Sequence, residues 1–315
     1  MHIVGRKKLL VFISIIIMAV TLTMLLLYFH GKSNKGAESE DWHLYGDGVY
    51  FNVYTEDTKG QEITGTFENV TSDTVFYASI QNSGQNRYVK LACYLNYEMV
   101  PIEMLNSDYD NDQILLEDKC NITIPFKLKC KIDTDKNYKL LVSLFLGTDL
   151  HESDTKYETT VHTLSYDYYL KNREDSAISL NVPQDSSTEL IDNDYPGFVL
   201  NTDYSSTSDG VKFPPSEVKV AQGETFKLAY RIGQIGNAHQ QLMLVTIDYQ
   251  QANINGERSL MIETEEGRTS FGLITLKAPE TKGKYEICAL VVPNPESSNE
   301  FTLLENAYRF TLTVE

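Results

Sequence analysis

The chain has 315 residues, 42% of them hydrophobic and 23% charged, which is a globular composition and excludes a wholly disordered protein. Its formal net charge is −17, and residues 1–35 hold five basic and no acidic residues, so the remainder is still more acidic. Such a surface repels phosphate backbones and anionic head groups, which disfavours nucleic acid and lipid surfaces as ligands. Four cysteines are too few for a disulfide scaffold at this length.

An uncharged apolar segment, Leu9 to Phe29, lies near the N-terminus. Its length fits a helix that crosses the hydrocarbon core. A cleaved signal peptide is the alternative, although its apolar region is usually shorter and no A-x-A-like site follows here. The sequence therefore predicts a single-pass cell-membrane protein with a cytoplasmic stub (1–8), a transmembrane helix (9–29), a stalk (30–44) and an extracellular C-terminal ectodomain.

Beyond the stalk the apolar residues recur with a period of two, which is typical of strands with one buried face. The clearest example is the segment from Cys120 to Ile132, whose apolar residues alternate with Asn, Thr and Lys. Pro125 on its polar side indicates an edge or a bulge. No amphipathic helical stretch competes, so the sequence predicts an all-β ectodomain.

The two halves of this ectodomain resemble one another. A strand beginning at Phe76 is followed by one that ends at Asn96-Tyr97-Glu98, and a strand beginning at Phe226 by one that ends at Asp248-Tyr249-Gln250. Downstream, residues 135–144 match residues 282–291 in position and character. We interpret this as two copies of one supersecondary plan, with module 1 at 45–172, a polar linker at 173–197 and module 2 at 198–315.

The segment 273–292 contains a strand, a turn with Pro279 and Gly283, and a strand led by Tyr285. In this it resembles bacterial immunoglobulin-like modules, at the level of the superfamily. The resemblance implies two immunoglobulin-like β-sandwiches in which Tyr285 and Tyr138 are corner tyrosines that bond backbone upstream. Cys288 has no partner in its module, and Trp42, the only tryptophan, lies in the stalk, so the disulfide and packed tryptophan of antibody domains are absent.

The sequence lacks the common motifs of catalytic sites. The chain has no G-x-S-x-G and no H-E-x-x-H, and Ser216 to Lys219 fits S-x-x-K only at a strand entry without the accompanying motifs. Glycine-rich phosphate loops are missing as well. The sequence therefore predicts a protein that is not an enzyme and has no catalytic or cofactor-binding residues.

The weak metal candidate is the acidic segment 106–117, with Asp108, Asp110, Asp112 and Glu117 as oxygen ligands for Ca²⁺. Asn111 replaces the glycine of a calcium loop and no flanking helices are expected, so a solvated acidic hairpin is the preferred interpretation. No metal site is assigned, and Ca²⁺ stays open as a possible ligand.

Two further sets of residues have a structural and a functional interpretation. Cys93, Cys120 and Cys130 are expected to be small buried hydrophobes, with a disulfide from Cys93 to Cys120 or Cys130 left open, and the disulfide state of Cys288 is left open as well. The tyrosines at 166, 168 and 169 could stack on sugars, but tyrosine is also a favoured strand residue.

The function predicted from these features is that of a membrane-anchored extracytoplasmic binding or scaffold protein. It would recognise another envelope or membrane protein without catalysis, and its ligands would not include nucleic acid. The alternative is a carbohydrate or cell-wall-binding surface protein, possibly assisted by calcium. An enzyme with an unfamiliar carboxylate site is the third hypothesis.

Overall fold

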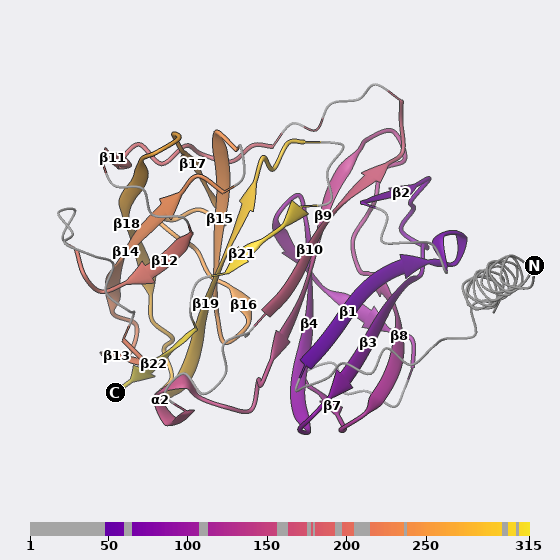
Figure 1. The fold of residues 1–315 in the computed structure, drawn as a ribbon, viewed down its shortest axis with the longest axis horizontal. Coiled ribbons are helices and arrows are strands. Elements are labelled where there is room, and N and C mark those ends of the chain that lie inside the picture. The colour runs from indigo at the N-terminus through magenta and orange to yellow at the C-terminus, as the bar shows by residue number, and fades with distance from the viewer. Residues whose placement is uncertain are drawn as a thin grey trace, which may run out of the picture. The chain divides into compact units, whose positions relative to one another are not determined.

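The fold is known from a computed structural model, which describes residues 48–59, 65–106, 113–155, 163–174, 178, 180–192, 197–204, 215–235, 238–297, 302–306 and 309–315. They belong to one compact unit, Gly46–Glu315. The described elements are strands, apart from a single turn of 3-10 helix at Glu56–Thr58 and the short helix α2 at Glu152–Thr155 (Figure 1). The predicted all-β class is confirmed.

Strands from the first half form two sheets. One has the order β1-β3-β8-β6, which are Gly48–Thr55, Phe76–Ser83, Cys120–Leu128 and Ile102–Met104. The other has the order β2-β10-β9-β4-β5, which are Thr66–Glu68, Thr163–Lys171, Tyr138–Leu146, Arg87–Leu95 and Glu98–Val100. Its β4 also pairs with β7 (Ile114–Leu116), and its β10 with β20 (Thr302–Leu303), a strand from near the C-terminus.

The second half repeats this plan. One sheet has the order β11-β18-β14-β12, which are Glu189–Ile191, Thr269–Lys277, Thr225–Gly233 and Phe198–Asn201. The other has the order β13-β22-β19-β15-β16, which are Glu217–Val220, Phe310–Val314, Gly283–Pro293, Gln240–Ile247 and Gln250–Gln251. Here β17 (Leu260–Glu263) pairs with β15, and β21 (Glu305–Asn306) pairs with β19. In both halves a short strand, β2 or β13, runs parallel to the last long strand.

Each pair of sheets encloses its own hydrophobic core. In the first sandwich, Phe51, Phe76 and Phe126 from neighbouring strands are fully buried. In the second, Leu228, Ile274 and Val291 are fully buried. The strict alternation of buried and partly exposed residues along β3 explains why the period of two in the sequence was informative.

The same tight turn follows β4 and β15. Asn96 and Tyr97 both have positive φ, at 49° and 66°, and Asp248 and Tyr249 do too, at 51° and 64°. Two consecutive residues of this kind match the type I′ turn that suits the twist of a two-stranded hairpin, and Asn and Asp tolerate it well. The similarity between Asn96-Tyr97-Glu98 and Asp248-Tyr249-Gln250 therefore marks one turn used twice.

Both predicted corner tyrosines bond backbone upstream. The Tyr285 hydroxyl donates to the carbonyl of Thr281 at 2.9 Å. In the first sandwich the direction is reversed, because the Tyr138 hydroxyl accepts from the amide of Asp133 at 3.0 Å. Each bond ties the start of a long strand, β9 or β19, to the turn that leads into it.

The predicted single-pass location is corrected. Leu9–Phe29 lies outside the described residues, and within the described ranges no helix is both long and apolar enough to cross a membrane. A span needs about 20 apolar residues, whereas α2 has four.

Candidate recognition surface

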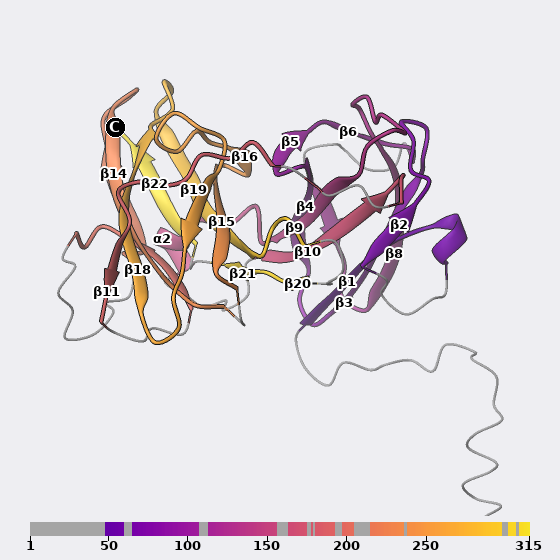
Figure 2. The same ribbon diagram turned by 90° about the horizontal axis from the view of Figure 1, so that it is seen from above.

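The face of the β4–β9 sheet that points away from its own core is covered by the matching face of the β15–β19 sheet. Figure 2 shows these two sheets lying between the outer sheets of the two sandwiches. Fully buried side chains from both sides, among them Tyr94, Leu141, Leu244 and Leu290, form a third hydrophobic cluster. The sandwiches thus share a core of their own, which we call the central layer.

The central layer contains a buried ion pair on the side of the first sandwich. Lys139 Nζ lies 2.6 Å from Asp167 Oδ2, and both side chains are at most 2% exposed. The Tyr97 hydroxyl lies 3.1 Å from the same carboxylate oxygen and 3.1 Å from the Pro295 carbonyl of the second sandwich. Lys139 also donates to the carbonyl of Ser297 at 3.0 Å. Lys139 and Tyr97 therefore both hydrogen-bond the backbone of the turn after β19.

A second pair occupies the equivalent place in the other sandwich with the charges exchanged. Arg309 Nε lies 3.2 Å from Glu286 Oε2, and both side chains are 1% exposed. Arg309 Nη1 donates to Leu146 O at 2.8 Å and to Gly147 O at 3.1 Å, in the turn after β9. Its contact with the Tyr249 hydroxyl, at 3.4 Å, matches that between Tyr97 and Asp167. Each sandwich therefore uses its buried cation to hold a turn of the other.

Helix α2 and the residue before it complete the second pair. Glu286 Oε1 accepts from the Thr311 hydroxyl at 2.7 Å and from the amide of Glu152 at 3.3 Å. It also lies 3.1 Å from His151 Nδ1. The Glu152 carboxylate is itself fully buried, 3.8 Å from Arg309 Nε. Because these partners come from both halves of the chain, the cluster joins the sandwiches through ion pairs and hydrogen bonds as well as through apolar area.

On the opposite sheet of the first sandwich, three strands present uncharged side chains to solvent. Its outward side chains lie in three rows across β1, β3 and β8, set by the register of the strands: Tyr50, Gln81 and Asn121; Asn52, Ser79 and Thr123; Tyr54, Tyr77 and Pro125. We call these residues the three-row face. The rings of Tyr54 and Tyr77 stack with their centroids 5.3 Å apart and their planes at 11°.

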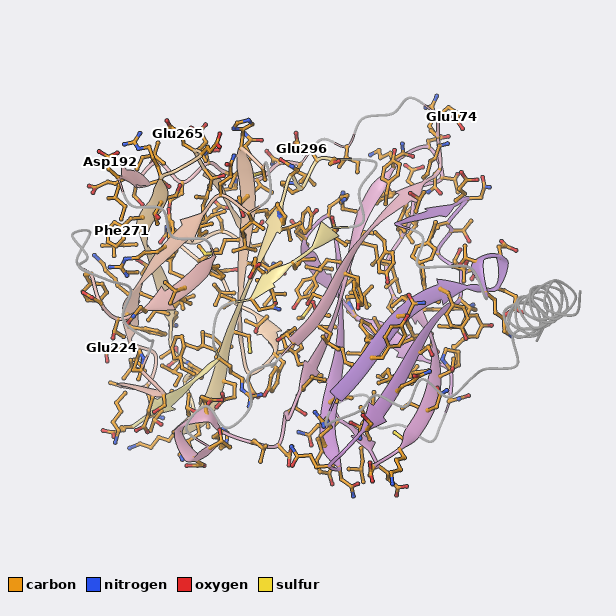
Figure 3. All side chains as sticks on the ribbon, viewed as in Figure 1. Glu174, Asp192, Glu224, Glu265, Phe271 and Glu296 are labelled. Atoms are coloured by element: carbon orange, nitrogen blue, oxygen red, sulfur yellow. The ribbon has the colours of Figure 1, made fainter. Side chains whose placement is uncertain are left out.

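Among the described residues of β1, β3, β8 and β6, outward charges lie beyond the ends of the three-row face, where Lys127 pairs in register with the exposed Glu103 of β6. Lys127 lies past the third row and 3.8 Å from Asp73, while Asp118 and Lys119 lie past the first. Elsewhere carboxylates are common at the surface, as Glu174, Glu265 and Glu296 at the margin of Figure 3 illustrate.

Two cavities of the described part of the chain lie away from the three rows. A cavity of about 540 Å³ is lined by Asp73, Glu103 and residues of the segment 127–131, and another of about 340 Å³ by Leu95, Glu98, Val182 and Arg258, together with their neighbours. Neither is lined by a residue of the three rows. Tyrosines beside neutral polar side chains are typical of protein-binding surfaces, so the composition of the three-row face suits a macromolecular partner.

The metal candidate is largely outside the described residues. Asp108, Asp110 and Asp112 belong to the segment 107–112, which is not described, and Glu117 lies just after β7 with its carbonyl accepting from Asn82 at 2.8 Å. The described ranges hold no group of three metal-ligating side chains. The calcium site stays an untested prediction.

The other residues singled out from the sequence have structural roles. Tyr168 and Tyr169 are buried, and Tyr166 stacks on Phe51 with centroids 5.6 Å apart, so this run belongs to the core rather than to a sugar-binding surface. All four cysteines are free, and burial raises the pKa of the Cys288 thiol to about 12. Lys219 lies 3.5 Å from Glu315 rather than serving Ser216.

Sequence reasoning missed both the central layer and the three-row face. A signal for the first was present, because β9 reads YKLLVSLFL and is buried almost throughout instead of alternating. A continuous apolar run indicates a strand covered on both faces. The ion pairs gave no such signal, since Lys139 and Asp167 are ordinary charged residues until the strands pair.

No protein-family model matches the chain, and no curated protein matches its sequence. Among solved structures, the CARDB domain of PF1109 from Pyrococcus furiosus is 14% identical with a TM-score of 0.24, over 43% of this chain and 94% of that one. The CsuC-CsuE chaperone-tip adhesion subunit pre-assembly complex from Acinetobacter baumannii is 7% identical with a TM-score of 0.26, over 84% of this chain and 100% of that one. The C-terminal domain of the AgI/II polypeptide BspA from Streptococcus agalactiae is 10% identical with a TM-score of 0.21, over 85% of this chain and 100% of that one.

The expected β-sandwich architecture is present in each half, because its described strands form two sheets around one core. Each half also has the tyrosine corner bond that the resemblance to immunoglobulin-like modules implied. No family is assigned.

Proposed function

We propose that the protein is a non-catalytic binding protein that recognises another protein, with its two sandwiches acting as one rigid body. The class of partner expected from the sequence is an envelope protein. The central layer carries this proposal. In the central layer, one sheet face and one buried ion pair of each sandwich contact the other sandwich.

A rigid body favours recognition because fewer degrees of freedom are lost when a partner binds. Pairs such as Lys139–Asp167 and Arg309–Glu286 are costly to bury, and their cations bond carbonyl oxygens of the opposite sandwich only in the docked arrangement. The docked arrangement in turn keeps the outward sheet β1-β3-β8 presented in a fixed geometry. The buried carboxylates Asp167 and Glu286 are each engaged by a cation, which suits a structural role for them.

Carbohydrate binding is the second candidate, favoured by one specific observation. The stacked rings of Tyr54 and Tyr77 lie beside amide and hydroxyl side chains, a combination that can contact both the apolar and the polar sides of a sugar. A protein partner is favoured because the face holds tyrosines and neutral polar side chains and no charge, the composition that distinguishes the centre of protein interfaces.

The test is in-cell crosslinking of the full chain followed by affinity capture and mass spectrometry. The control is a chain lacking residues 46–315. We expect a protein that is enriched only by the full chain. Enrichment of polysaccharide alone would support carbohydrate binding instead of protein binding. No enrichment above the control would contradict a binding function.

A further inference from the structure

The three-row face combines tyrosines with neutral polar side chains and holds no charge. Three of its members are tyrosine, and the others are serine, threonine, asparagine, glutamine and proline. Protein-binding surfaces are enriched in tyrosine and depleted of lysine, glutamate and aspartate. Antibody combining sites use the same pairing of rigid aromatic area with adaptable Ser and Asn hydrogen bonding.

The face is also held rigidly by the strands beneath it. Each row is pinned by antiparallel pairing of β1 with β3 and of β3 with β8, and the residues that alternate with it, such as Phe51, Ile80 and Ile124, are fully buried. Tyr54 and Tyr77 fix one another by stacking. Little side-chain freedom is therefore lost on docking.

The charge pattern indicates the kind of partner. The chain carries −17, so a basic partner would be drawn to its acidic surroundings, and its affinity would fall with salt. The three-row face offers such a partner no carboxylate to pair with. When a partner with a neutral polar surface docks on the three-row face, in contrast, no charge is buried without a partner.

We propose that the three-row face is the recognition surface for a protein whose contact area is itself uncharged and polar. This inference rests on the proposed function and names the surface and the partner chemistry for it. Binding through this face depends on tyrosine contacts and neutral hydrogen bonds, so its affinity is nearly independent of ionic strength.

The first step of the test places a photo-reactive amino acid in the full chain at Asn52, within the face. A second chain carries it at Thr225, an exposed strand residue of the second sandwich. A third carries it at Tyr204, a 52%-exposed residue of the second sandwich. We expect a protein to be crosslinked from Asn52 and not from Thr225. Crosslinks to a protein from Tyr204 alone would overturn this inference and leave the binding function standing.

The second step titrates that purified protein against the full chain and its variants. Ser79→Glu, at the centre of the three rows, is expected to weaken binding at least tenfold, and Tyr54→Ala likewise. Thr225→Glu, which adds the same charge to the second sandwich, is expected to change it less than twofold. Raising the salt to about 1 M, where the Debye length is about 3 Å, is expected to change the wild-type affinity less than threefold.

Thermal unfolding of each variant reports whether it folds, and Asn52→Asp serves as a further charge variant if Ser79→Glu does not. Unchanged affinity of folded face variants overturns the proposal. So does a steep fall of affinity with salt, or a neutral polysaccharide as the species crosslinked from Asn52.

Discussion

Among the buried residues, the two ion pairs of the central layer have opposite polarity at equivalent positions. In the first sandwich the strand β9 supplies the cation, Lys139, and in the second the matching strand β19 supplies the anion, Glu286. Both cations reach carbonyl oxygens of the opposite sandwich. Removing one partner leaves a buried charge without compensation, which is far more costly than losing an exposed pair.

Arg309→Ala is therefore expected to lower the free energy of unfolding by about 3–5 kcal/mol, because Glu286 and Glu152 are left buried without their cation. The matched control is Lys284→Ala. Lys284 pairs with Asp154 between the same segments at 2.6 Å, but its side chain is 37% exposed. We expect the control to cost at most about 1 kcal/mol. Equal losses in urea unfolding of the two variants would contradict this assignment.

Asp167 gives the central layer a predictable dependence on pH. Burial raises the pKa of Asp167 to about 6, against the opposing effects of Lys139 and Tyr97. Because this folded-state pKa lies above the ordinary value of 3.8, the folded state binds the extra proton. The stability contributed by the group is full below about pH 4 and is lost as the pH rises through about 6.

The comparison with Asp167→Asn isolates this effect. The stability of the wild type relative to the variant is expected to fall between pH 4 and pH 7, by up to about 3 kcal/mol at 1.36 kcal/mol per pKa unit. Urea unfolding at several pH values measures it. A difference that stays constant would show that Asp167 titrates as an ordinary carboxyl, and one that grows with pH would show that its pKa is lowered in the folded state.

At the scale of elements, the corner tyrosines tie β9 and β19 to the turns that precede them. Tyr285→Phe and Tyr138→Phe each remove one hydrogen bond to backbone. Each substitution is expected to cost about 1 kcal/mol of unfolding free energy. Tyr88→Phe, at a residue that is 37% exposed on β4, is the control and is expected to be nearly neutral. Corner variants as stable as the control would argue against a structural role for these bonds.

The sequence predicted those strands in which one face is buried and the other is exposed to solvent. Strand β3 alternates strictly between buried and partly exposed residues, and the paired turns at Asn96-Tyr97 and Asp248-Tyr249 were visible as a repeat. It could not reveal what covers β9 and β15, because a strand buried on both faces does not say which surface packs on it. The face formed by β1, β3 and β8 was missed for another reason. Its rows exist only through register, which joins residues far apart in the chain.

At the scale of the whole molecule, the claim is that residues 46–315 act as one body. The three hydrophobic clusters support it, since the third draws side chains from both sandwiches. Strand β20 supports it as well, because it leaves the second half of the chain to pair with β10 of the first. Rigid presentation of the three-row face follows from this arrangement.

The most direct test is hydrogen exchange measured by mass spectrometry across a urea series. It compares amides of β4, Arg87–Leu95, with those of β15, Gln240–Ile247, which face each other's sandwich through the central layer. We predict that both strands lose protection at one urea concentration in the wild type and that Arg309→Ala lowers the midpoint of both. Two well-separated midpoints in the wild type would contradict a single rigid body and the mode of recognition built on it.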